Sequence, residues 1–219
     1  WDDEGDFGTV PLPKPQEDAP LYFYAKKVPQ STVIIGTIAP GKESPEFYPF
    51  TVLDHLLGSG GFRSRIFQEV RSNRGLAYSA GSFYDGRQGY GSFGAYAMTK
   101  PESTGQVLGL IEGILKDARE SRVSAQDLHL AKRSIVNSYI FSFTSSHMIA
   151  LQHMMLEFQG LPTKFLTEYP ARIDAVSRED VLKVAEKVLD PNRRTVFVLG
   201  DDSKFDEPLK SFGTVKRLK

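Results

Sequence analysis

Arg71 and Tyr78 are the two residues of this sequence whose types and spacing could do chemistry. They stand seven positions apart in VRSNRGLAYSAGS (Val70–Ser82), at a predicted junction between a helix and a strand. Gly75 can adopt the left-handed conformation that ends a helix. Arg71 then lies in the last helical turn and Tyr78 in the outgoing strand. These two hydrogen-bond donors could hold a peptide carbonyl, or stabilise the oxyanion that forms when the carbonyl is attacked.

A purely structural interpretation of the same residues stays open. Arginines such as Arg71 and Arg74 favour the negative end of a helix, and a tyrosine on a strand usually packs against its neighbours. The donor pair also has no evident nucleophile to serve, because no Ser-His-Asp arrangement is legible in the sequence.

The histidines and cysteines give no metal motif. The chain has no cysteine, which excludes disulfides, thiolate zinc sites and cysteine nucleophiles. Neither H-E-x-x-H nor its inverse, H-x-x-E-H, occurs around the four histidines. His147 and His153 face different ways on a helix, whereas His153 and Glu157 share a face as an ordinary polar pair one turn apart. We therefore expect no metal on this chain.

The glycine-rich stretch GSGGF (Gly58–Phe62) is a candidate phosphate loop. A phosphate-binding loop follows a strand and continues with Lys-Ser or Lys-Thr, and here a predicted helix precedes the glycines and no such pair follows them. We interpret the stretch as a turn between two helices.

Composition narrows the class of protein. The chain has 219 residues, of which 40% are hydrophobic and 25% charged, as in an ordinary soluble protein. Lys+Arg and Asp+Glu are both 27, so the zero net charge removes the electrostatic argument for nucleic-acid binding. No apolar run reaches the roughly 18 residues of a membrane span, and the N-terminus has no signal peptide. The chain does not begin with Met, which indicates a processed product or a segment of a longer protein.

Three segments are predicted along the chain: an acidic, Pro-rich linker over 1–20, one domain over 21–200 and a mixed-charge tail over 201–219. Within the domain, the first half combines strands rich in β-branched residues with two helices and a hairpin. The expected elements are strands at 21–28 and 31–39 with a turn at Pro29-Gln30, a helix capped by Ser44 and ended by Gly58–Gly61, a helix over 63–73, and strands at 78–84 and 90–98 around a tight turn at Asp85-Gly86.

The second half is predicted to be helical and to end in a strand. The expected elements are helices at 102–119, at 124–158 with a break near 144–146, at 162–169, and at 177–188 behind a Ser177/Asp180 capping box, and then the strand RTVFVLG over 194–200. Hairpins with helices inserted between them predict an α+β fold, with a largely antiparallel sheet and helices packed on one face.

The stretch GSGGFRSRIFQEVRSNRGLAYSAGS, with the glycine- and aromatic-rich hairpin after it, resembles the C-terminal, zinc-free domain of pitrilysin/insulinase-family zinc metallopeptidases. These include bacterial two-domain enzymes and mitochondrial processing peptidase, and the similarity covers about 21–200. The resemblance implies the processing-peptidase-like metallohydrolase fold. It also implies that an arginine and a tyrosine, seven apart, bind and polarise the scissile peptide carbonyl. Arg71 and Tyr78 match these positions, and Arg74 does not.

The resemblance further implies a partner. The zinc and the catalytic glutamate are expected on a zinc-bearing N-terminal-type domain or subunit, which closes with this one around an unfolded peptide. The acidic segment 1–20 fits the joint between two such halves. This chain alone is then expected to cleave nothing, and the expected compartment is the bacterial periplasm or cytoplasm.

Two other interpretations stay open. The chain could be a non-catalytic scaffold or adaptor subunit of the same family, like the core subunits of respiratory complexes, or an unrelated α+β binding module. The intact Arg71/Tyr78 pair favours the peptidase half, because a scaffold has no need of it.

Overall fold

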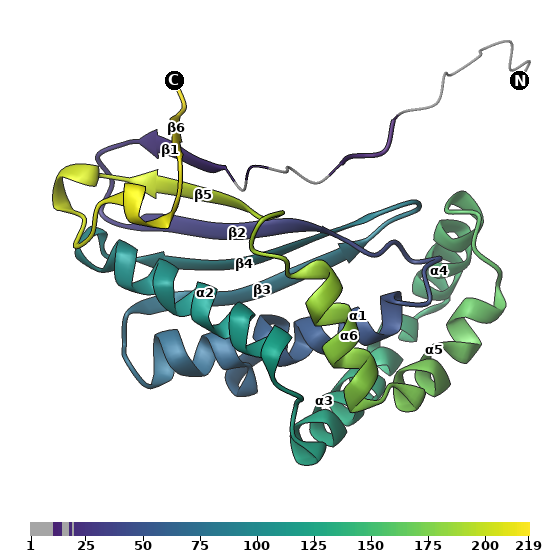
Figure 1. Cartoon of the computed structure of the whole chain (residues 1–219). Coiled ribbons are helices and arrows are strands. Elements are labelled where there is room, and N and C mark those ends of the chain that lie inside the picture. The colour runs from purple at the N-terminus through teal and green to yellow at the C-terminus, as the bar shows by residue number, and fades with distance from the viewer. Residues whose placement is uncertain (1–10, 15–17, 19) are drawn as a thin grey trace, which may run out of the picture.

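The computed structural model describes residues 11–14, 18 and 20–219. The predicted linker over 1–20 therefore lies largely outside the described residues and stays a prediction. From Leu21 onward the chain forms one mixed sheet with helices beneath it (Figure 1).

The sheet has six strands in the order β3-β4-β2-β5-β1-β6. β3–β4, β4–β2 and β2–β5 pair antiparallel, and β1 pairs in parallel with both β5 and β6, which confirms a largely antiparallel sheet. The strands are β1 Leu21–Ala25, β2 Ser31–Ala39, β3 Ala77–Gly86, β4 Gly91–Thr99, β5 Thr195–Gly200 and β6 Val215–Arg217.

The chain bends at Pro29-Gln30 between the first two strands as expected, but β1 and β2 do not pair with each other, because they are not neighbours in the sheet. β5 lies between them and pairs with both. Strands lie about 4.8 Å apart, so the 26–30 connection must cross roughly 10 Å, which five extended residues span with ease. The returning strand β5 can therefore enter this gap and supply both neighbours with backbone partners.

The C-terminal segment adds a strand that the sequence pattern did not predict. The Leu21 amide donates to the Thr214 carbonyl (3.2 Å), and the Leu218 amide donates to the Phe23 carbonyl (2.8 Å). Leu209 is buried against the core. β6 is only three residues long. Its pairing comes from backbone groups on β1, so side-chain alternation over so few residues carries little information.

The β3–β4 hairpin turns later than expected. Asp85 and Gly86 pair with Ser92 and Gly91 inside the ladder, so they are strand residues rather than the turn. The turn lies over 87–90, where the Arg87 amide donates to the Tyr90 carbonyl (2.8 Å). Gly89 supplies the positive φ of 81° that such a turn needs.

The helices match the predicted order with shifted ends. Ser44 does not cap the first helix: its Oγ accepts from the Glu46 amide (3.2 Å) in a preceding turn that holds Pro45. The break after the third α-helix is confirmed near Thr144. The helices are α1 Phe47–Asp54, α2 Thr104–Glu120, α3 Ala125–Tyr139, α4 Ser146–Phe158, α5 Lys164–Ala175 and α6 Arg178–Val188, and the short turns are η1 His55–Ser59, η2 Gly61–Arg63, η3 Phe67–Ser72, η4 Pro101–Ser103, η5 Ile140–Phe143, η6 Asp202–Lys204 and η7 Leu209–Phe212.

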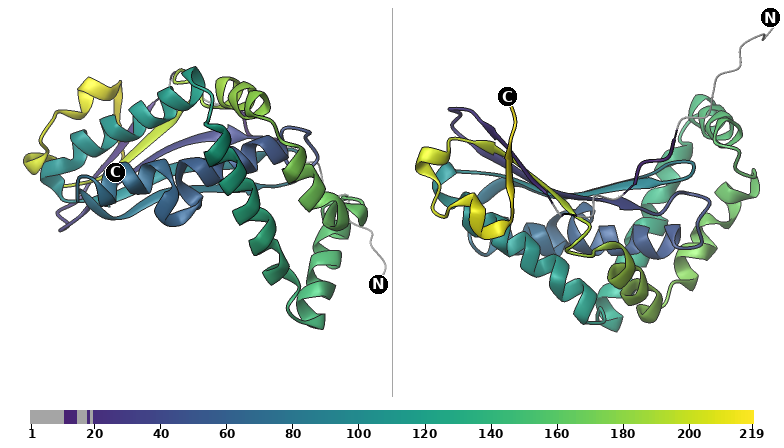
Figure 2. Two further views of the ribbon diagram at one scale, coloured as in Figure 1. Left: turned by 90° about the horizontal axis from the view of Figure 1, so that it is seen from below. Right: turned by 45° about the horizontal axis from the view of Figure 1, so that its top comes forward.

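One face of the sheet carries the core. α1, α2, α3 and α6 lie on the same side of the strands, and α4 and α5 extend beyond one end of the sheet (Figures 1 and 2). Each fully buried Leu, Ile or Phe contributes about 1.5–3 kcal/mol to folding. The largest fully buried side chains come from both layers: Leu21, Phe23, Val33, Ile35, Phe50, Val52, Leu57, Ile66, Val70, Leu108, Ile111 and Ile173. No helix of the described part is long and apolar enough to cross a membrane.

The predicted capping box is present at the start of α6. Ser177 Oγ accepts from the Asp180 amide (3.1 Å), and the Asp180 carboxylate accepts from the Ser177 amide (2.9 Å). The hydroxyl and amide of Ser177, both donating to the carboxylate, lower the pKa of Asp180. A lowered acid pKa stabilises the fold above the unfolded-state value near 4, and this stabilisation is lost as pH falls.

We predict that Ser177→Ala lowers the free energy of unfolding at pH 7 by about 1 kcal/mol, because it removes the cap. Urea unfolding of the wild type and the variant measures the difference. The difference should shrink below pH about 4, where the carboxylate becomes protonated. A difference that is zero at pH 7, or equal at pH 7 and pH 3, would contradict this account.

Candidate functional site

Arg71 and Tyr78 meet at the edge of the sheet, as the sequence predicted. Arg71 lies in η3, and its guanidinium carbon is 4.2 Å from the centroid of the Tyr78 ring. The two side chains therefore stack in a cation–π contact, which contributes about 0.5–1 kcal/mol at an exposed position. Tyr78 is 78% exposed, so the ring and its hydroxyl face outward.

A β-bulge explains why Tyr78 faces outward. Ala77 pairs with Thr99 and Ser79 pairs with the adjacent Met98, so Tyr78 is an extra residue with no partner on β4. A bulge of this kind re-aims a side chain that the alternation of the strand would place elsewhere. The sequence pattern did not predict the bulge, because alternation cannot register an inserted residue.

The end of η3 determines the position of Arg71, the other residue of the pair. The Asn73 amide donates to the Gln68 carbonyl, five residues back (2.8 Å), which is the wide π-helical spacing. Gly75 then takes a φ of +63°, and the Leu76 amide donates to the Val70 carbonyl (2.9 Å). The predicted left-handed stop at Gly75 is confirmed, and it turns the chain into β3 directly beside Arg71.

Arg74, the nearby alternative, is engaged elsewhere. Its guanidinium pairs with the Glu69 carboxylate and also donates to the Glu69 carbonyl (3.2 Å). Arg71 has no such acid among the described residues. Its guanidinium carbon lies 4.8 Å from the Phe67 ring centroid, so Arg71 contacts a second aromatic ring besides that of Tyr78. The donors of Arg71 thus remain available to a carbonyl oxygen.

The described residues hold no group of three or more His, Cys, Asp or Glu side chains that could bind a metal ion. Thr51, Asp54 and His55 have the spacing of H-x-x-E-H, with threonine in place of the first histidine and aspartate in place of glutamate. The Asp54 carboxylate is buried and accepts from Ser82 Oγ (2.5 Å), and Thr51 Oγ1 donates to the Phe47 carbonyl (2.8 Å). Burial raises the pKa of Asp54 and lowers the pKa of His55. Thr51 and Asp54 are thus engaged in hydrogen bonds within the fold, to the Phe47 carbonyl and the Ser82 hydroxyl.

The uncovered face of the sheet is a second feature, which the sequence analysis missed. We call it the open face. Its side chains form two rows across the strands, which the strand registers define. One row is Tyr96, Ile34, Phe197 and Tyr22, and the other is Met98, Thr32, Leu199 and Tyr24.

The open face is apolar and accessible. Tyr24, Met98 and Phe197 are exposed, although their strand neighbours such as Phe23 and Val198 are fully buried on the helix side. The Tyr22 and Phe197 ring centroids lie 5.6 Å apart. Figure 2 shows this side of the sheet without a helix over it. The sequence signal for this apolar surface was that these strands carry apolar residues at successive positions, and so on both faces, rather than only on the face that packs against the helices.

Residues 4–135 match the family described as the peptidase M16 inactive domain, and the chain belongs to that family. This confirms the resemblance found in the sequence, and with it the α+β class.

Sequence relatives and solved structures are consistent with this family membership. A Streptomyces coelicolor protein named as an uncharacterized zinc protease is 30% identical over 175 residues, covering 80% of this chain and 38% of the relative. Cytochrome b-c1 complex subunit 2 of Rattus norvegicus is 26% identical, covering 63% of this chain and 32% of the relative. The crystal structure of a peptidase M16 inactive domain from Pseudomonas fluorescens has a TM-score of 0.81 at 22% identity, covering 89% of this chain and 46% of that one. The chain thus spans less than half the length of these relatives.

We predict that Gly75→Ala destabilises the fold by about 1–2 kcal/mol, because a Cβ is strained at this positive φ although no atom blocks it. Gly113→Ala is the matched control: Gly113 lies inside α2, a Cβ there also meets nothing within 4 Å, and its φ is not positive. The control should stabilise by up to about 1 kcal/mol. Thermal unfolding of both variants checks the opposite signs; equal signs would contradict the strain at Gly75.

Proposed function

We propose that this chain is the second, non-zinc half of a zinc metalloendopeptidase, in which Arg71 and Tyr78 bind and polarise the scissile carbonyl of an unfolded peptide. The observation that carries the proposal is the exposed Arg71–Tyr78 stack, which has donors to offer and no acceptor among the described residues. The zinc, held by another domain or subunit, supplies the Lewis acid. Family membership supports this division, because the matched domain is the inactive one.

The geometry suits carbonyl polarisation. The Tyr78 hydroxyl and the Arg71 guanidinium are both hydrogen-bond donors. They do not use these donors on each other, because the guanidinium lies over the ring of Tyr78. Stacking limits the rotamers of both side chains, so less conformational entropy is lost when a carbonyl arrives. Donors fixed in this way strengthen their hold as negative charge develops on the oxygen, most of all when a closed chamber excludes water.

The open face supports a closing role for the same domain. Tyr24, Met98 and Phe197 are large apolar side chains that are all exposed on this face. Single exposed apolar residues are normal on a protein surface, but a group on one face indicates an interaction surface. We propose that it lines the chamber that forms when the zinc-bearing domain closes over it. Residues 1–20 would join the two halves, and the domain of 21–200 with its 201–219 tail would be one wall.

A scaffold or adaptor role is the second candidate. It is favoured by the likeness to cytochrome b-c1 complex subunit 2, a component of a respiratory complex by its name. That likeness covers less of this chain and is less identical than the likeness to the named zinc protease. A scaffold would need the fold and the open face, but it would have no function for the Arg71–Tyr78 stack.

We predict that the purified chain cleaves no peptide, because the part of the chain that the structure describes offers no cluster of metal ligands to activate water. Fluorogenic peptides incubated with the chain, with and without added zinc, measure this. The same chain should support cleavage once a zinc-bearing half is added. Turnover by the chain alone that a chelator abolishes would refute the proposed division of labour.

In the assembled enzyme we predict that Tyr78→Phe lowers kcat about 10²–10³-fold, the usual effect of removing one oxyanion donor. The phenyl ring preserves the stack on Arg71, so the unfolding temperature should not move. Arg71→Ala should lower kcat similarly and also raise KM, because it removes a charged donor to the substrate.

The control for Tyr78→Phe is Tyr90→Phe, which removes a hydroxyl in the 87–90 turn, at the opposite end of the β3–β4 hairpin from Tyr78 and outside the rows of the open face. It should leave kcat unchanged. If peptide cleavage survives Tyr78→Phe or Arg71→Ala at the level of this control, the assigned role is wrong and the scaffold alternative gains.

A further inference from the structure

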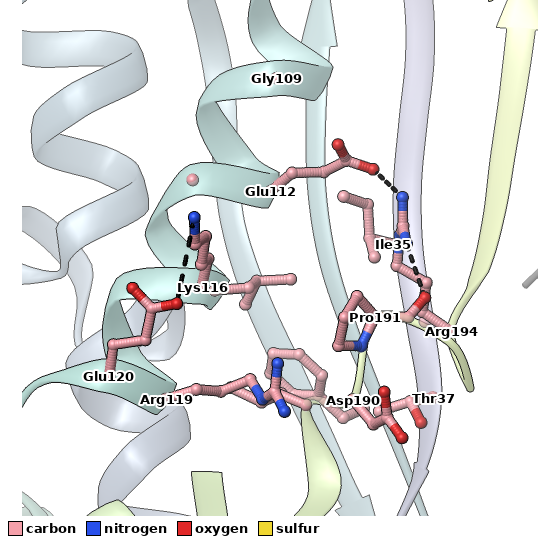
Figure 3. Close-up of a pocket in the computed structure, with 15 residues that line it drawn as sticks. Ile35, Thr37, Gly109, Glu112, Lys116, Arg119, Glu120, Asp190, Pro191 and Arg194 are labelled. Atoms are coloured by element: carbon pink, nitrogen blue, oxygen red, sulfur yellow. Dashed lines mark hydrogen bonds and ion pairs between the residues drawn. The ribbon is translucent and has the colours of Figure 1, made fainter. Parts of the chain in front are cut away.

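A pocket separates α2 from the turn that leads into β5 (Figure 3). Its volume is about 410 Å³, within the range of small-molecule sites. The floor is apolar and consists of side chains from both layers of the fold: Ile35, Phe93, Leu115, Leu189 and Pro191. None of the elements that carry Arg71 and Tyr78 lines it, so it is separate from the site described above.

Most charged groups at the pocket are already neutralised in pairs. Arg194 pairs with the Glu112 carboxylate and also donates to the Pro191 carbonyl (2.6 Å). Lys116 lies 4.0 Å from the Glu120 carboxylate at the outer rim. Figure 3 marks both pairs with dashed lines. These four groups can hold the walls of the pocket without attracting an ion.

Arg119 and Asp190 are different. Arg119 extends from α2 toward Asp190, and no ion pair joins them or links either one to another described residue (Figure 3). The Nε atoms of Arg119 and Arg194 are both buried without a hydrogen-bond partner in the described part of the chain, but of these two arginines only Arg194 has a carboxylate partner there. Among the described residues, the Asp190 carboxylate accepts only from the Asn192 amide (2.9 Å), which leaves its second oxygen without a partner there. A cation and an anion thus border the same apolar floor with unused hydrogen-bonding capacity.

Two glycines on α2 leave part of the pocket wall without side chains. Gly109 and Gly113, one helical turn apart, both line the pocket. A Cβ at Gly113 would meet nothing within 4 Å, and one at Gly109 would make only an ordinary contact with Phe212. Packing therefore does not require glycine at Gly113, although each glycine in a helix is unfavourable relative to alanine. Their shared effect is to leave the mouth of the pocket open.

We propose that this pocket binds a zwitterion with an apolar side chain, a free amino acid or a dipeptide. The carboxylate would accept hydrogen bonds from Arg119, the ammonium group would donate to Asp190, and the side chain would cover Ile35 and Leu189. A simple anion would be repelled by Asp190 and a simple amine by Arg119, so only a ligand with both charges satisfies both groups. The proposal does not depend on the proposed peptidase role.

Binding is measured on the chain by NMR, titrating L-leucine and L-leucyl-L-leucine, which distinguish the amino acid from the dipeptide. We expect saturable amide shifts confined to α2, the 189–194 turn and the pocket-lining residues of β2 and β4. N-acetyl-L-leucinamide, 4-methylpentanoate and 3-methylbutylamine carry the same apolar group with neither charge or only one. Each should bind at least about tenfold more weakly, because a charge-assisted hydrogen bond is lost.

Two variants test the geometry. Arg119→Gln should weaken binding about tenfold or more, and Gly113→Leu should block the pocket while the unfolding temperature stays equal or rises. Arg133→Gln, which removes an exposed arginine on α3, is the matched control and should bind as the wild type does. If neither zwitterion saturates at tens of millimolar, if the capped leucine binds as well, or if Arg119→Gln binds like the control, the proposal is overturned.

Discussion

Burial on one side of the sheet is the constraint on which the other features depend. The strands present Phe23, Val33, Ile35 and Val198 to the helices, and these residues are buried almost completely. Hydrophobic burial of this kind supplies most of the favourable free energy of folding. Because the hydrophobic core forms on the helix side of the sheet, the opposite side of the same strands can carry aromatic residues that the core does not need. The edge of the sheet is likewise free to hold a strained junction.

The stack of Arg71 on Tyr78 is an outcome of backbone geometry on both sides. A π-helical turn, a left-handed glycine and a bulged strand residue each depart from regular helix or strand geometry. Deviations of this kind persist where the surrounding packing enforces them, here through the fully buried Val70 and Ile66 of the same segment. These three irregularities meet at one pair of donors, the Arg71 guanidinium and the exposed Tyr78 hydroxyl.

Much of this fold could be predicted from the sequence, because its helices and most of its strands carry strong local patterns. Ser124 and Ser177 mark helix starts by capping chemistry, and Gly75 marks the stop between Arg71 and Tyr78. What could not be predicted depends on partners distant in sequence. The insertion of β5 between β1 and β2 depends on backbone pairing across more than 150 positions, as in the register of Val33 with Val198. The pocket beside Arg119 likewise depends on how α2 meets the turn at Asp190.

The bulge at Tyr78 has a consequence for how the molecule behaves in solution. β3 is the outer strand at one end of the sheet, and β6 closes the other end beside β1. An uninterrupted outer strand offers its backbone as a template on which a second chain can extend the sheet. The inserted residue breaks the regular repeat of amide and carbonyl groups along this border. The same irregularity that displays a tyrosine therefore also shortens the regular outer edge, on which a second strand could pair, to Ser79–Gly86.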